Sequence, residues 1–266
     1  MITALLDGGP ASGKTTLALH LAAAWAARRE RVIVVDVSST LGALRWHEMR
    51  IRTGLVPLFR VVPAAPERLD PRSLARLARR AHVIIDGPSG DSALSLRALL
   101  VGDLAIIPTR PSPANMAAAL AMVSLALDAR ARSRAAPVRF VFNRSRPRFD
   151  RDREIAEMRA EYEPALLDST VDHHGIFADA MAHGRLVDEL VGGDPACRDI
   201  AALADELLGL PLPALVNRRT GSLLARLLPP WVRDRSDRAP SEPAVAFTTE
   251  DSVAIGAPVA SDGEPS

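Results

Sequence analysis

Residues 2–16 read ITALLDGGPASGKTT, and this stretch decides the fold. A short apolar run, typical of a strand, leads into a glycine-rich turn and then into Lys14–Ala27, whose Ala and Leu content predicts a helix. The turn matches the pattern G-x-x-x-x-G-K-[ST], in which glycines let successive backbone N–H groups curl around phosphate oxygens and the helix N-terminus adds positive potential. The stretch therefore predicts a P-loop that holds the phosphates of ATP. Its predicted binding residues are Gly8, Gly9, Pro10, Ala11, Ser12, Gly13, Lys14, Thr15 and Thr16.

The lysine of this loop is the sole lysine of the chain. The sequence has 33 Lys plus Arg residues, and all of them except Lys14 are arginine. A coding bias toward arginine would explain the excess of arginine over lysine. However, the one remaining lysine stands where a flexible ammonium group suits the β- and γ-phosphates better than a planar guanidinium. The next residue, Thr15, has a hydroxyl suited to Mg²⁺. Together the two residues favour a working site over a glycine turn that matches by coincidence.

Length and composition fit a packed α/β protein with an appendage. The chain has 266 residues, 48% of them hydrophobic and 24% charged, which is typical of a folded core. A net charge of +1 excludes the molecule as a whole as an electrostatic binder of nucleic acid. The single cysteine excludes an internal disulfide and a multi-cysteine metal site. The sequence shows no signal peptide and no long apolar span, so we expect a cytoplasmic protein.

Strand and helix signals alternate from the N-terminus to about Leu208. The expected strands are Ile2–Leu6, Arg31–Asp36, Leu58–Val62, His82–Asp86, Leu104–Pro108, Val138–Phe142 and Ala165–Asp168. The expected helices are Lys14–Ala27, Thr40–Arg52, Pro71–Arg80, Ser92–Leu100, Ala114–Ala131, Asp152–Tyr162, Ile176–His183 and Ala196–Leu208. This alternation predicts a P-loop NTPase of the α/β class, with a mostly parallel twisted sheet and helices on both faces.

The sequence changes character after residue 210. We expect the ATPase domain to span 1–210, an amphipathic helix or linker to span 211–233, and a disordered tail to span 234–266. The helix carries a leucine stripe with arginines around it. Docking on the domain is its simpler interpretation, and contact with a membrane or a partner is the alternative.

Two expected strands end in aspartate. Asp86 closes HVIID and Asp36 closes RVIVVD, so both belong at the carboxyl edge of the sheet, where ligands bind in open α/β folds. We predict that Asp86 joins Thr15 in holding Mg²⁺, as a Walker-B residue, and that Asp36 orients the attacking water. With Lys14 they form the predicted catalytic set. The alternative is that either aspartate only caps a turn after its strand.

Five segments resemble, in order and spacing, the ParA/MinD family of deviant Walker-A ATPases, and most closely its small ParA-type partition proteins. The segments are VIVVDVSSTLGALRWHEMR at 32–50, VIIDGPSG at 83–90, LAIIPTRPSPANMAAA at 104–119, FVFNR at 140–144 and IFADAMAHG at 176–184. The resemblance implies that Asn143 reads the adenine edge. It also implies slow, partner-stimulated ATP hydrolysis and an ATP-dependent homodimer that binds DNA without sequence preference. By this resemblance the dimer would associate with the nucleoid and work with a small basic ParB-like partner. It would partition plasmids or chromosomes, or position other large cargo.

The chain departs from the family pattern at four places. The signature lysine of K-G-G-x-G-K is Gly9 here, and the two glycines after it are Pro10 and Ala11. The second aspartate of D-x-D is Ser38, and the position where many relatives have a DNA-binding arginine is His174. In this family the signature lysine makes a contact across the ATP-bridged dimer. Since the chain has no lysine other than Lys14, an arginine would have to make that contact here.

Two other functions remain open. A small-molecule or nucleotide kinase is compatible with the unmodified G-x-x-x-x-G-K-T loop, although the sequence shows no arginine-rich lid. A nucleotide-gated binding module with weak hydrolysis is the second alternative. The arginines after the Asn143 strand fit either a solvated, salt-bridged face or a phosphate-contacting patch. They are Arg144, Arg146, Arg148, Arg151 and Arg153.

Overall fold

The computed structural model describes residues 1–7, 11–65, 69–90, 92–132, 136–145, 151–162 and 165–210. The sequence predictions for Gly8–Pro10, for Arg146 and Arg148, and for the segments 211–233 and 234–266 lie outside the described residues. None of the helices in the described ranges has both the length and the apolar character needed to cross a membrane.

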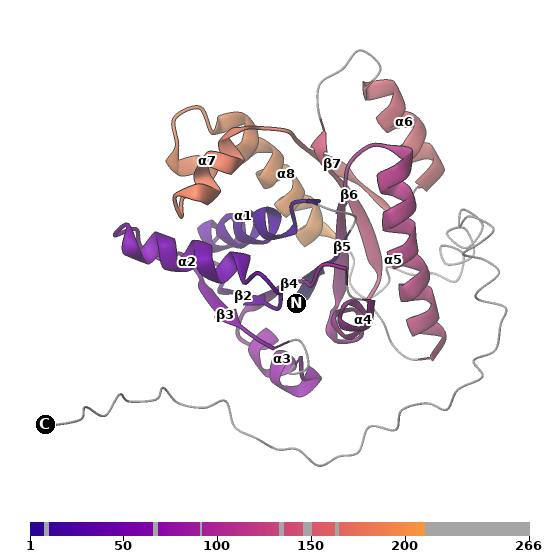
Figure 1. Ribbon diagram of the computed structural model, residues 1–266, viewed down its shortest axis with the longest axis horizontal. Helices are drawn as coiled ribbons and strands as arrows, with labels where there is room; N and C mark the ends of the chain where they lie inside the picture. The colour runs from indigo at the N-terminus through magenta and orange to yellow at the C-terminus, as the bar shows by residue number, and fades with distance from the viewer. Residues whose placement is uncertain are drawn as a thin grey trace, which may run out of the picture.

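A seven-stranded sheet forms the centre of the protein, in the order β3-β2-β4-β1-β5-β6-β7 (Figure 1). Each neighbouring pair is parallel, as the alternation of strands and helices predicts. β1 lies between β4 and β5, so the P-loop that follows it opens at the carboxyl edge of the sheet. The strands are β1 (Ile2–Leu5), β2 (Val32–Asp36), β3 (Arg60–Pro63), β4 (His82–Asp86), β5 (Leu104–Thr109), β6 (Val138–Ser145) and β7 (Leu166–Asp172).

Helices cover both faces of the sheet (Figure 1). One face carries α1 (Lys14–Ala27), α2 (Gly42–Arg52), α7 (Ile176–Ala182), the short helix η2 (Val187–Glu189) and α8 (Asp194–Gly209). The other carries α3 (Pro71–Ala78), α4 (Ser92–Val101), α5 (Pro113–Arg132) and α6 (Arg151–Tyr162). Successive residues of β4 enter opposite cores: Ile84 belongs to the cluster of Trp25 and Leu203, and Ile85 to the cluster of Leu99. This confirms the α/β class with two helical layers.

The last two strands are longer than the sequence pattern predicts. β6 continues from Phe142 to Ser145, so Asn143 lies within the strand, and β7 reaches Asp172 rather than Asp168. The pairing of β6 with β7 shifts register twice, between Phe140 and Phe142 and between Asn143 and Ser145. Such irregularities interrupt the regular alternation of a strand, which is why the sequence signal fades there.

Candidate functional site

The phosphate loop turns into α1 through a left-handed glycine. Gly13 is the N-cap of α1 with φ of 88°, and its carbonyl accepts a hydrogen bond from the Leu17 N–H at 2.9 Å. A Cβ at this position would lie 2.5 Å from Asn143 Nδ2. Only glycine satisfies both the backbone angle and this close approach. The geometry explains why the P-loop pattern requires glycine directly before its lysine.

Lys14 begins α1, and its ammonium group has two protein partners. Nζ donates to Asp7 Oδ1 and to Ser89 Oγ, each at 2.9 Å. The lysine is only 8% exposed. Asp7 precedes the loop and Ser89 lies in the turn after β4, so the ammonium joins the ends of two adjacent strands. Neither partner was predicted from the sequence, although Asp7 adjoins the P-loop and Ser89 lies in the VIIDGPSG turn.

Thr15 and Asp86 meet as the sequence predicts for a metal site. Thr15 Oγ1 donates to Asp86 Oδ2 at 2.7 Å. Asp86 is fully buried, and burial raises its pKa to about 7. The hydrogen bond from Thr15 opposes this rise, the nearby Asp36 carboxylate adds to it, and Lys14 opposes it. A buried carboxylate with a raised pKa gains from a cation beside it.

The donor set at this position suits Mg²⁺. Asp86 Oδ1 is buried, and in the described part of the chain it has no hydrogen-bond partner. This free carboxylate oxygen and the Thr15 hydroxyl are the hard oxygen ligands that Mg²⁺ prefers. The described residues contain no group of three or more His, Cys, Asp or Glu side chains that could hold a metal by themselves. Mg²⁺ is usually held by one or two protein oxygens, with nucleotide phosphates and water completing its shell.

Asp36 lies beside Asp86 in the pairing of β2 with β4. Its Oδ1 accepts from the backbone N–H and the hydroxyl of Ser38 at 3.0 and 2.7 Å, and its Oδ2 accepts from the Leu44 N–H at 3.0 Å. The carboxylate thus ties the end of β2 to the first turn of α2. Two oxygens offer about four acceptor positions, and these hydrogen bonds use three of them. Its predicted role in orienting the attacking water stays a prediction.

A cavity of about 240 Å³ adjoins the other side of the loop, lined by residues that include Thr16, Asn143, His174 and Phe177. Asn143 Nδ2 donates to the Ser12 carbonyl at 2.6 Å, and its Oδ1 accepts from the backbone of the next residue. Asn143 therefore fixes the loop at the wall of this cavity. Its reading of adenine stays a prediction.

Two residues that line this cavity have partners of their own. Arg144 follows Asn143, and His174 lies two positions beyond the end of β7. Arg144 has φ of 57° and donates from Nη1 to the Ala11 carbonyl at 2.9 Å. His174 Nε2 lies 2.8 Å from Asp199 Oδ2. Neither contact was foreseen from the sequence, because each joins residues far apart in the chain. The structure thus brings Lys14, Thr15, Asp36, Asp86 and Asn143 to one edge of the sheet.

Comparison with known proteins agrees with this geometry. The profile of the CobQ/CobB/MinD/ParA nucleotide binding domain matches residues 4–187, which include all five of these residues. The chain belongs to this family. The match confirms the resemblance to ParA/MinD ATPases that the sequence segments indicated.

Three proteins represent its relatives. The chain is 32% identical over 127 residues to the Maintenance of carboxysome distribution protein A of Gloeobacter kilaueensis, with 47% of this chain and 56% of that protein aligned. It is 25% identical over 216 residues to the protein of the same name from Halothiobacillus neapolitanus, covering 78% of this chain and 95% of the relative. The structure of a Cyanothece McdA variant in complex with ATP superposes with a TM-score of 0.61 at 15% identity, covering 79% of this chain and 97% of the other, so the likeness is one of fold.

Proposed function

We propose that this protein is a Mg²⁺-dependent ATPase that dimerises on ATP and positions or partitions a large cargo. The observation that carries the proposal is the contact of Thr15 with Asp86 next to the buried Lys14. Lys14 would bind the β- and γ-phosphates, and the backbone from Ala11 to Gly13 would wrap the phosphate chain. Mg²⁺, when bound through Thr15 and Asp86, would neutralise charge on the phosphates.

The chain's own carboxylates would divide the remaining work. Asp36 is held by three hydrogen bonds, and a positioned carboxylate suits the orientation of a water for attack. Asn143 and the cavity beside it would receive the base. Slow turnover that a partner accelerates fits a site whose water-orienting group is already engaged with its own loop.

The cargo is proposed from the relatives. Two of them are named for the distribution of carboxysomes, so we propose a large intracellular body as cargo, with DNA of the nucleoid as the surface on which the dimer assembles. A plasmid or chromosome is the alternative cargo, with a small basic ParB-like partner. The proposed place of action is the cytoplasm, on the nucleoid.

The mass of the protein in solution tests this proposal. The Asp36→Ala variant, in which we expect no turnover, is measured with and without ATP-Mg²⁺, then with non-specific duplex DNA at low and high salt. We expect a dimer only with ATP, and DNA binding that weakens as salt rises. A protein that binds ATP but stays monomeric and ignores DNA would refute dimerisation and favour a nucleotide-gated binding module.

A kinase is the second candidate, because a second cavity lies on the phosphate side of the site. It measures about 500 Å³ and is lined by residues after β2, β3 and β4, among them Val37, Ala64 and Ser89. Ser89 is a partner of Lys14, so a small acceptor molecule in this cavity would lie near a γ-phosphate. Labelled γ-phosphate that appears on an acceptor, rather than as free phosphate, would identify this function.

A further inference from the structure

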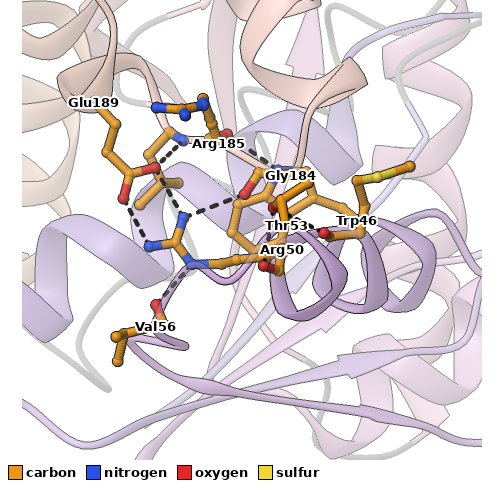
Figure 2. Close-up of polar contacts among 9 residues, drawn as sticks. Trp46, Arg50, Thr53, Val56, Gly184, Arg185 and Glu189 are labelled. Atoms are coloured by element: carbon orange, nitrogen blue, oxygen red, sulfur yellow. Dashed lines mark hydrogen bonds and ion pairs between the residues drawn. The ribbon is translucent and has the colours of Figure 1, made fainter.

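A buried arginine holds the turn between α2 and β3 in place (Figure 2). Arg50 is 2% exposed, and its Nε donates to the Val56 carbonyl at 2.8 Å. Its other nitrogens donate to the Gly184 carbonyl at 3.2 Å and to both oxygens of Glu189 at 2.7 and 2.8 Å. Burying a charge is costly unless it is fully partnered. Arg50 therefore joins this surface turn, at Val56, to Gly184 and Glu189.

Aromatic packing also holds this turn on its buried side. The Trp46 ring stacks on Phe59 with centroids 5.9 Å apart and an interplanar angle of 2°, and Trp46 Nε1 donates to the Arg185 carbonyl at 3.1 Å. Phe59 is buried, while its neighbours Leu58 and Arg60 are exposed. Phe59 thus packs inward on Trp46, while the residues on either side of it are exposed.

Three apolar side chains of this part of the chain are exposed. Ile51, Val56 and Leu58 are 53%, 72% and 49% exposed. They are three of the seven large hydrophobic side chains that are exposed among the described residues, and they fall within eight consecutive positions. Several exposed apolar groups on a segment that is anchored by hydrogen bonds and aromatic packing suit a docking site.

Exposed arginines flank these apolar groups. Arg45, Arg52 and Arg60 are exposed, and Glu48 is the single acidic residue between positions 45 and 60. We name the three apolar and three arginine side chains the α2–β3 patch. A surface with this composition suits an acidic segment that carries apolar side chains.

The chain itself contains such a segment. Residues 241–266 have five acidic residues and no basic one, which leaves +6 for residues 1–240 of a chain whose net charge is +1. Apolar residues are interspersed with the acidic ones: Val245 and Phe247 precede Glu250 and Asp251, and Val253 and Ile255 follow them. This segment lies outside the described residues, and its sequence supplies the charges and apolar groups named above.

We propose that the acidic segment 241–266 docks on the α2–β3 patch of its own chain. About 30 residues separate it from the end of α8, and at a maximum of roughly 3.3 Å per residue a chain of that length is long enough to reach across a small domain. Because the segment and the patch belong to one chain, docking is intramolecular, which raises the effective concentration of the segment at its own patch. Weak ionic and apolar contacts are enough at that concentration. The proposal goes beyond the proposed function and does not rest on it.

Photocrosslinking in the full chain tests the docking. Phe247 is replaced by p-benzoylphenylalanine, equal amounts of ¹⁴N- and ¹⁵N-labelled protein are mixed and irradiated, and adducts are mapped by mass spectrometry. We expect adducts at residues 45–60 of the same chain. Reversing Arg52→Glu and Arg60→Glu together should lower their yield about tenfold, because two attractions become repulsions. Raising the salt to about 1 M should lower it too, since the screening length falls to about 3 Å.

Matched variants make the result specific. Arg79→Glu with Arg80→Glu makes the same charge change at exposed positions after α3 and should leave the yield unchanged. Glu250→Arg with Asp251→Arg should restore the yield in the Arg52→Glu, Arg60→Glu chain. Adducts scattered over the surface, or an equal loss in the control variant, would overturn the proposal. Adducts between differently labelled chains would also overturn it and point to a second copy as the occupant. Nucleotide turnover of these variants is measured separately, so failure of the ATPase proposal is distinguishable.

Discussion

The raised pKa of Asp86 predicts how the free energy of unfolding changes with pH. Replacing Asp86→Asn removes a buried carboxylate but keeps an oxygen for the Thr15 hydroxyl. Because burial raises the pKa of Asp86 from 3.8 to about 7, the folded protein binds more protons than the unfolded chain between these two values. Stability contributed by this group therefore falls as pH rises through that window. The asparagine variant has no such loss.

The size of the effect follows from the shift. At 1.36 kcal/mol per pKa unit, a carboxyl that moves from 3.8 to about 7 loses about 4 kcal/mol of stability in full, of which about 2–3 kcal/mol develops between pH 5 and pH 8. Relaxation around a buried charge reduces such figures. We expect the free energy of unfolding of Asp86→Asn, relative to the natural protein, to rise by about 1–2 kcal/mol between pH 5 and pH 8.

Urea unfolding in EDTA, without nucleotide, measures this difference at each pH. Asp70→Asn is the control, because Asp70 caps α3 and a hydrogen bond from Ser73 lowers its pKa. Asp70 is therefore ionised in both states from pH 5 to pH 8, and the effect of its substitution should not change with pH. A constant difference for Asp86→Asn over the same range would refute the assignment of the raised pKa.

Three further substitutions test the site and its support. Lys14→Ala should weaken ATP binding at least about 100-fold, since charge-assisted phosphate contacts are lost; an unchanged Kd by calorimetry would exclude the site. Asp36→Ala should retain ATP binding and stop phosphate release, and a loss of affinity would instead assign Asp36 to the metal or to the fold. Glu189→Ala should cost about 2–3 kcal/mol in urea unfolding, because it leaves Arg50, with its side chain 3% exposed, as a buried unpaired charge. Removing the exposed Asp205 of another ion pair should cost at most about 0.5 kcal/mol, and equal losses would contradict the argument.

Much of the fold was predictable because its signals are local. The glycine turn before Lys14 and the buried strands that end at Asp36 and Asp86 can be read without knowing what packs against them. The extensions of β6 and β7 could not, because their residues become strand only by pairing across an irregular register. α2 begins at Gly42 rather than Thr40, since Leu41 adopts a left-handed conformation with φ of 49°. Such a conformation is uncommon for leucine.

The sequence by itself determined the chemistry of the site: a phosphate loop with the only lysine, and two aspartates at strand ends that a parallel sheet must bring to one edge. The tertiary structure alone decided which groups hold those residues. Asp7 and Ser89 meet Lys14, and Arg50 meets Glu189, across 7, 75 and 139 positions of the chain. Partners as far apart in the chain as Lys14 and Ser89, or Arg50 and Glu189, depend on the order of strands in the sheet and on the packing of helices against it. Neither composition nor periodicity encodes that information.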